Sequence, residues 1–151
     1  MREILFRAKR IDNGEWVYWN IFGELCRKSG KGTRLEIQNG ATISYYDYIH
    51  QIRQFISADT ICRCTGLTDK NGKKIWENDI VKRYNANGEE WRISKIVWAD
   101  HSLNMGWCIE DVKSLTEYSN RLFKVGFDVN DTEKCEVIGN TFDNVDLLKG
   151  E

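Results

Sequence analysis

Proline is absent from this chain of 151 residues, so no turn is fixed by a proline ring. Long apolar runs are absent too, and none approaches the roughly 18 residues that suggest a membrane-spanning helix. The first ten residues, MREILFRAKR, lack the apolar segment of a secretory signal, which predicts a cytoplasmic protein that does not bind a membrane. With 41% hydrophobic and 30% charged residues, the chain is expected to fold.

Cysteine and histidine occur, but in no pattern that indicates a reactive site. Five cysteines, an odd number in a chain without an export signal, predict free thiols rather than disulfides. Cys62 and Cys64 flank a single residue of a predicted strand, whereas structural zinc sites favour two to four intervening residues. His101 and Cys108 lack the motif context of an acyl-transfer site, and the glycine-rich nucleotide motifs do not occur. We therefore predict no catalytic residue, metal or cofactor.

Charge is divided unevenly along the chain, although the net charge is only −1. Residues 1–34 carry eight Lys and Arg against four Asp and Glu, whereas residues 99–151 carry five against eleven. A basic first third and an acidic last third suit a head-to-tail contact between two copies. They suit equally a monomer whose two ends lie side by side.

Turn signals divide the chain into short strands. Asn13 and Gly14 between two alternating runs predict an N-terminal hairpin, because both residue types tolerate the positive φ of a tight turn. The run from Trp91 to Trp98 has apolar residues on both faces, which predicts a strand that is covered on both sides. Six or more such strands predict a mainly β, antiparallel structure in the form of a small barrel or roll.

The predicted turn residues are Asn13, Gly14, Asp69, Asn71, Gly72, Glu77, Asn78, Asp79 and Gly139. The carboxylates among them could indicate acid–base chemistry or a cation site. We favour the structural interpretation, in which such side chains bond the turn backbone.

One helix is predicted in the first third of the chain. Tyr45, Ile49, Ile52 and Ile56 follow one another at spacings of four, three and four, which places them on one helical face. The tyrosines and isoleucines of this segment would also suit a strand.

Aromatic and basic residues are interleaved in two predicted hairpins. If exposed, they would form a platform on which single-stranded nucleic acid can stack, or an anchor for a protein partner. As core aromatics with cations on the wet face of the same strands they are structural, and this interpretation is favoured. The residues of this candidate binding surface are Arg7, Lys9, Arg10, Trp16 and Trp19 in the first hairpin and Lys82, Arg83, Trp91 and Arg92 in the second.

Three sequence blocks resemble the YopX-like family of phage and prophage proteins. They are FRAKR…NGEWVYWN within Phe6–Asn20, TGLTDKNGKKIWENDIVK at Thr65–Lys82 and EVIGNTFDN at Glu136–Asn144. The chain has Asn78 where the family has the glycine of Glu-Gly-Asp, a change that keeps the turn because asparagine tolerates a left-handed backbone. The resemblance implies an SH3-type β-roll in the C-terminal part, a phage or prophage setting and no known molecular function.

These observations predict a hairpin, loop and short helix over residues 1–55 and a YopX-like β-roll over residues 56–151. We predict a non-enzymatic phage or prophage accessory protein that works as a homo-oligomer and binds a protein partner of phage or host. A nucleic-acid-binding module is the alternative interpretation. The fold class and the basic first third favour it, whereas the net charge of −1 and a pI near 6.2 disfavour it.

Overall fold

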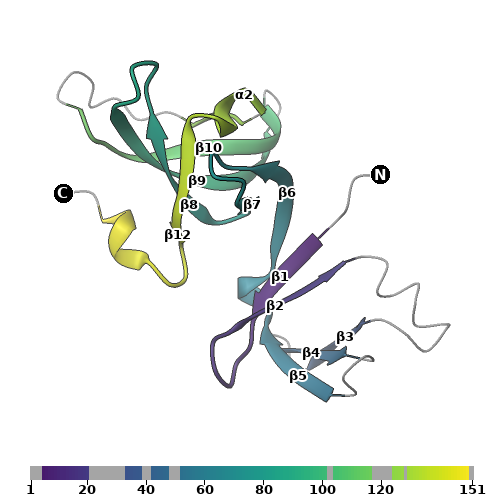
Figure 1. Cartoon of the computed structure of the whole chain (residues 1–151). Helices are drawn as coiled ribbons and strands as arrows, with labels where there is room; N and C mark the ends of the chain where they lie inside the picture. The colour runs from purple at the N-terminus through teal and green to yellow at the C-terminus, as the bar shows by residue number, and fades with distance from the viewer. Residues whose placement is uncertain are drawn as a thin grey trace. The chain divides into compact units, whose positions relative to one another are not determined.

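The computed structural model describes residues 5–20, 33–38, 42–47, 52–101, 104–116, 124–127 and 129–149 (Figure 1). These residues are mainly β, and their strands pair antiparallel. The chain divides into two compact units, Met1–Cys64 and Thr65–Glu151, so the division lies after Cys64 where the sequence suggested residue 55. None of the helices within the described ranges is long and apolar enough to cross a membrane.

The first unit is built around an N-terminal hairpin. Strand β1 (Leu5–Lys9) pairs with β2 (Trp16–Asn20) on one side and with the start of β6 (Cys62–Thr68) on the other. Gly14 has a φ of 70° in the connecting turn, where the Asn13 side chain accepts a hydrogen bond from the Glu15 N–H. A small core forms where Ala8 packs against Ile56, both fully buried, with Val17 and Ile61 at its margin.

The helix predicted around Tyr45–Ile56 is wrong. Strands β3 (Thr33–Gln38), β4 (Thr42–Asp47) and β5 (Ile52–Ser57) form a three-stranded sheet in sequence order, followed by the short 3-10 helix η2 (Ala58–Thr60). Ile49 lies outside the described residues. Four apolar positions are too few to distinguish the two periods, and β-branched and aromatic side chains fit a paired strand better than a helix.

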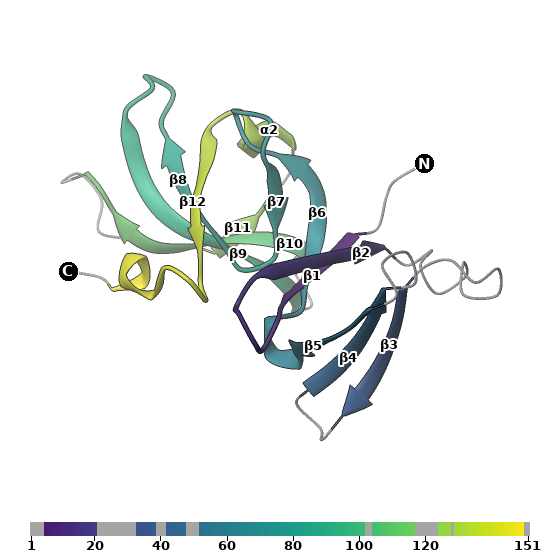
Figure 2. The same ribbon diagram turned by 60° about the horizontal axis from the view of Figure 1, so that its bottom comes forward.

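The second unit is built on a five-stranded sheet with the strand order β11-β10-β9-β8-β12 (Figure 2). Its strands are β8 (Asp79–Tyr84), β9 (Glu90–His101), β10 (Asn104–Ser114), β11 (Lys124–Gly126) and β12 (Cys135–Asn140). Strand β7 (Lys74–Trp76) lies beside β6, and α2 (Val129–Thr132) and the 3-10 helix η3 (Val145–Leu148) are short.

The core of this unit lies on one face of the five-stranded sheet. Cross-strand partners share a face, and here β8, β9 and β10 contribute Val81, Ile96 and Ile109, each fully buried. Ile93 points to the opposite face and is only 3% exposed. The strand expected to be covered on both sides therefore has buried apolar residues on both.

Asp69 joins the turn after β6 to the outer edge of β12. Its Oδ1 accepts hydrogen bonds from the backbone N–H groups of Asn71 (2.8 Å) and Lys73 (3.0 Å). Its Oδ2 accepts one from the Val137 N–H (2.9 Å), and the Lys70 N–H donates to the Cys135 carbonyl (3.1 Å). One buried carboxylate thus closes a turn and covers a strand edge.

The other predicted turn residues lie at or beside turns, except Gly139, which lies inside strand β12. Asn78 has a φ of 67°, beside Glu77 in the turn between β7 and β8, and the Asp79 side chain accepts a hydrogen bond from the Trp76 N–H (2.8 Å). Gly139 lies at a register shift in β12, where a Cβ would collide with Asn144. Because asparagine tolerates a left-handed backbone conformation, Asn78 can occupy the position where the family has glycine.

Candidate functional site

The N-terminal hairpin brings together part of the predicted binding surface. Lys9 faces Trp16 and Arg7 faces Tyr18 across the β1–β2 pair, so the four side chains share one face. The Arg7 guanidinium lies 4.2 Å and the Lys9 Nζ 5.1 Å from the centre of the Trp16 ring. Arg7 is only 7% exposed, whereas Tyr18, which the sequence did not single out, is 53% exposed.

Two other members of the first hairpin do not join this face. Arg10 follows the last residue of β1, where it forms an isolated bridge with Ile56, and its side chain forms an ion pair with Asp12. The side chain of Trp19 lies outside the described part of the structure.

In the second unit, three of the four predicted residues come together. Arg83 on β8 faces Arg92 on β9, and Trp91 occupies an irregularity in the same strand pair. The Trp91 ring centre lies 4.9 Å from the Arg83 guanidinium and 4.6 Å from that of Arg92, within the range of cation–π interaction. The remaining residue, Lys82, points to the other face of β8 and forms an ion pair with Glu90 at 2.7 Å.

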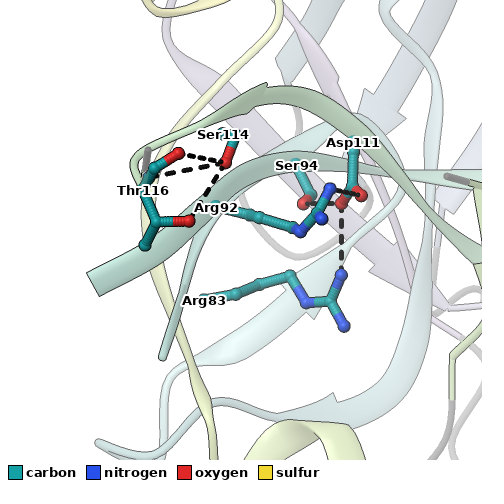
Figure 3. A network of polar contacts seen from close by, with 6 residues as sticks. All are labelled: Arg83, Arg92, Ser94, Asp111, Ser114 and Thr116. Carbon is teal, nitrogen blue, oxygen red and sulfur yellow. Dashed lines mark hydrogen bonds and ion pairs between the residues drawn. The ribbon is translucent and has the colours of Figure 1, made fainter. Parts of the chain in front are cut away.

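Asp111 on β10 connects the two arginines (Figure 3). Its Oδ1 accepts hydrogen bonds from Arg83 Nη1 (3.1 Å) and Ser94 Oγ (2.7 Å), and its Oδ2 accepts one from Arg92 Nη1 (2.7 Å). The side chains of Arg92 and Asp111 are 2% and 1% exposed, and that of Arg83 is 14% exposed. Arg92 is therefore an interior residue rather than part of an exposed platform.

This cluster of Arg83, Trp91, Arg92, Ser94 and Asp111, here called the arginine cluster, carries two positive charges against one negative. Charged groups removed from water are costly unless they are paired and hydrogen-bonded, and Asp111 satisfies this condition for both guanidiniums. The one hydroxyl beside a carboxylate, that of Ser94, is fully buried. The excess positive charge of the cluster suits the recognition of an anion.

Asp111 was missed by the sequence reasoning, although a signal was present. It follows Trp107–Glu110 in a β-prone run, and aspartate is depleted in strands. A carboxylate at such a position indicates a buried partner, which the sequence does not identify.

An exposed aromatic surface lies farther along the same sheet. Trp98 on β9 faces Trp107 on β10, with ring centres 5.1 Å apart and planes at 80°. Val125 on β11 faces Ile109, so it shares this face. Trp98 is 42% and Val125 39% exposed, whereas Ile96 and Ile109 beside them are buried. The core thus continues into an accessible apolar surface, here called the Trp98 surface.

A third polar group lies where the Asp69 turn meets β8 and β12. The Tyr84 hydroxyl donates to Glu136 Oε2 (2.8 Å), and Lys70 Nζ lies 3.9 Å from the Tyr84 ring centre. The hydrogen bond to Glu136, followed by burial and the Glu136 charge, raises the pKa of Tyr84 to about 12. A phenol with a raised pKa stays protonated near neutral pH, so this group can hold the turn but is a poor acid.

The described cysteines form no disulfide bonds, and most are buried. Cys62, Cys108 and Cys135 are buried and Cys64 is half-buried. Burial, followed by the charge of Asp69, raises the pKa of Cys135 to about 12. In the described ranges no group of three or more His, Cys, Asp or Glu is arranged to hold a metal ion.

Comparison with known proteins identifies one family and one similar fold. The model of the family described as YopX protein matches residues 5–149. The crystal structure of protein EF1440 from Enterococcus faecalis is similar, with a TM-score of 0.50 and 21% identity over 97% of this chain and 98% of that chain. At this identity the similarity supports the fold alone. No curated protein matches the sequence.

Proposed function

Since the chain belongs to the YopX protein family, we propose that it is a phage or prophage accessory protein that acts by binding proteins, including further copies of itself. The proposed setting follows from the family resemblance of the three sequence blocks, and the proposed compartment is the bacterial cytoplasm. The proposed activity is association rather than catalysis, because the described side chains offer exposed binding surfaces, whereas the Ser94 hydroxyl beside Asp111 is fully buried.

The Trp98 surface is the observation that carries this proposal. A tryptophan that is 42% exposed and packed edge-on against a second tryptophan presents a rigid apolar anchor at little cost in side-chain entropy. Tryptophan is enriched among the residues that dominate the energy of protein interfaces. A neighbouring exposed valine on the same face extends the contact area.

The opposite net charges of the two units support self-association of the chain. Residues 1–64 carry ten Lys and Arg against seven Asp and Glu, and residues 65–151 carry twelve against sixteen. The first unit is therefore net positive by three and the second net negative by four, which favours contact between unlike units of two copies. Exposed pairs contribute only about 0–1 kcal/mol each, so apolar contacts must supply most of the affinity.

We also propose that the second unit is an SH3-type β-roll. Support comes from its antiparallel five-stranded sheet, the strands β6 and β7 beside each other, and the Asp69 turn over the β12 edge. Such small β-rolls serve as binding modules with many unrelated partners, so the fold by itself does not identify the partner.

Single-stranded nucleic acid is the second candidate ligand, and one observation favours it. The β1–β2 face combines Lys9 and Trp16 with the exposed Tyr18 ring, whereas Arg7 on the same face is buried. Stacking on an exposed aromatic residue beside cations is the usual mode of sequence-tolerant binding. In the second unit the predicted platform is weakened, because Arg92 is buried and Lys82 is paired with Glu90.

Light scattering of the purified chain at micromolar concentration tests the proposal. We expect a mass above that of the monomer, and we expect Trp98→Ser to shift the equilibrium towards the monomer. Leu115→Ser is the matched control, since Leu115 is a similarly exposed apolar residue (38%) of the same unit outside the Trp98 surface. A monomer mass for the unmodified chain at every salt concentration would reject self-association.

Fluorescence anisotropy with a labelled single-stranded oligonucleotide at low salt separates the two candidates. Binding that Tyr18→Ala abolishes and Trp98→Ser leaves unchanged would favour the nucleic-acid function over the protein-binding one. Absence of binding at low salt removes the second candidate, because phosphate contacts are strongest under that condition.

A further inference from the structure

We propose that Arg83 is an anion-binding residue that takes the carboxylate of an acidic side chain on a protein partner. This inference rests on the proposed protein-binding function and adds a recognition site to it.

Arg83 uses only part of its guanidinium within the described part of the chain. Nη1 donates to Asp111, and neither Nε nor Nη2 takes part in an ion pair or hydrogen bond there. Neither nitrogen is sealed from solvent, although the side chain is only 14% exposed. Figure 3 shows the other terminal nitrogen pointing away from Asp111. The Nε–Nη2 edge is the pair of parallel donors that matches an oxyanion.

In Arg10 of the same chain, both donors of the Nε–Nη2 edge are hydrogen-bonded. Its Nε donates to Asp12 Oδ1 (2.9 Å) and its Nη2 donates to Asp12 Oδ2, so both donors of the edge are occupied by one carboxylate. Arg83 has no such partner for this edge in the described residues, and neither nitrogen of the edge is sealed from solvent. The comparison gives the expected ligand geometry, which is two oxygens of one group held side by side.

The surroundings of Arg83 favour binding because they fix the guanidinium before a ligand arrives. Trp91 lies against it on one side and Asp111 holds Nη1, so little side-chain entropy remains to be lost. The arginines and Asp111 together carry one excess positive charge. A single bound carboxylate would neutralise it, whereas a second cation would increase the repulsion.

A protein carboxylate fits this site better than a nucleic acid strand. A strand needs a row of cations along its backbone, but Lys82 is engaged by Glu90 and Arg92 is buried. One accessible edge, flanked by a half-buried tryptophan, matches the arginine and aromatic anchors of protein interfaces. The expected partner is therefore a segment that presents one or more acidic side chains.

Nuclear magnetic resonance of the full, isotope-labelled chain tests this inference through the Nε–H signals of its arginines. A capped tetraglutamate peptide, added at low salt, should move the Arg83 signal in a saturable way and leave the Arg10 signal in place. Arg83→Lys should weaken peptide binding by about tenfold or more, because one of two charge-assisted hydrogen bonds is lost. Arg83→Lys keeps the charge beside Asp111, so it avoids the unfolding that Arg83→Gln could cause.

Three results would overturn the inference. These are no shift at Arg83, an equal shift at Arg10, or a shift with inorganic phosphate or a single-stranded oligonucleotide but none with the peptide. A capped tetralysine peptide serves as the charge control and should have no effect. Trp98→Ser separates this site from the proposed self-association: it should abolish oligomers and leave the peptide titration unchanged, so either proposal can fail alone.

Discussion

Asp111 is a single residue on which two buried or nearly buried guanidiniums depend. Replacing it with asparagine keeps the shape but removes the carboxylate that pairs with both Arg83 and Arg92. Breaking a buried ion pair from one side costs about 3–5 kcal/mol, so we expect Asp111→Asn to lower the free energy of unfolding by that amount. Urea denaturation followed by circular dichroism measures it.

Ser94→Ala is the control for Asp111→Asn, since it removes a neutral donor to the same carboxylate. We expect a loss of about 1 kcal/mol for this variant. If both variants cost the same, the stabilisation comes from ordinary hydrogen bonding rather than from charge.

Tyr84 makes the stability of the protein depend on pH in the alkaline range. Its pKa is raised from 10.0 to about 12, chiefly by its hydrogen bond to Glu136, so the folded state holds the phenolic proton more tightly than the unfolded state. This stabilisation is complete below pH 10 and is lost as the pH rises through 12. The difference in unfolding free energy between the native chain and Tyr84→Phe should therefore shrink between pH 10 and 12.

Urea denaturation of both proteins at several pH values checks this expectation. Other groups that titrate in this range, such as lysines, do so in both proteins and cancel in the comparison. A difference that stays constant up to pH 12 would mean that Tyr84 contributes nothing through its proton.

Cys135 should resist thiol reagents as long as the protein is folded. The thiolate is the reactive form, and burial raises the pKa of this thiol from 9.0 to about 12. With iodoacetamide at mildly alkaline pH, we expect mass spectrometry to find the Cys135 peptide unmodified in the native state and modified in urea. Half-buried Cys64 is the internal comparison and should react first. Equal rates at the two cysteines in the native state would contradict the burial of Cys135.

At the level of whole elements, the Asp69–Lys73 turn depends on a glycine. Gly72 has a φ of 81° and nothing lies within 4 Å of the position that a Cβ would take, so a substitution there meets backbone strain and no clash. We expect Gly72→Val to cost about 1–3 kcal/mol, because a β-branched residue resists this conformation.

Lys73→Val introduces the same side chain one position later and keeps the N–H that donates to Asp69. Since Lys73 is exposed, its replacement should change the denaturation midpoint little. A midpoint that Gly72→Val leaves unchanged would count against the turn as a determinant of stability.

The strands with tight turns were predictable from the sequence, whereas strands β4 and β5 were not, and a helix was expected in their place. Asn13 and Gly14 identify the first hairpin through local backbone preference, which needs no knowledge of distant residues. Tyr45 and Ile56 belong to two strands whose pairing, Tyr45 with Gln54 and Ile43 with Ile56, is non-local. Apolar spacing alone does not reveal such a pairing, so a helical period was assigned to an antiparallel pair.

The candidate site was also predictable only in part, because its residue types are visible in the sequence but its non-local contacts are not. Arg83, Trp91 and Arg92 stand out as aromatic and basic residues of neighbouring strands, and the structure brings them together. Whether they face water depends on Asp111, which lies 28 positions from Arg83. An ion pair over this separation depends on strand order, which local sequence does not encode.

At the scale of the whole molecule, the unlike charges of the two units predict salt-dependent assembly. Raising NaCl from about 0.1 M to about 1 M shortens the screening length from about 10 Å to about 3 Å. We expect light scattering to show slower or weaker association at high salt without complete dissociation, because apolar contacts are not screened. Association that is indifferent to salt would reject the charge-steered form of the proposal, and complete dissociation would reject the apolar one.

The Asp69 contact with β12 also protects the protein against aggregation through this strand edge. Exposed strand edges offer unpaired backbone groups that recruit strands from other molecules and start aggregates. On β12 the Val137 N–H and the Cys135 carbonyl are already bonded to the turn, so this edge cannot act as a template while Asp69 is in place. Loss of that carboxylate should therefore produce fibrillar or amorphous deposits at protein concentrations where the native chain remains dispersed, even if most molecules are still folded.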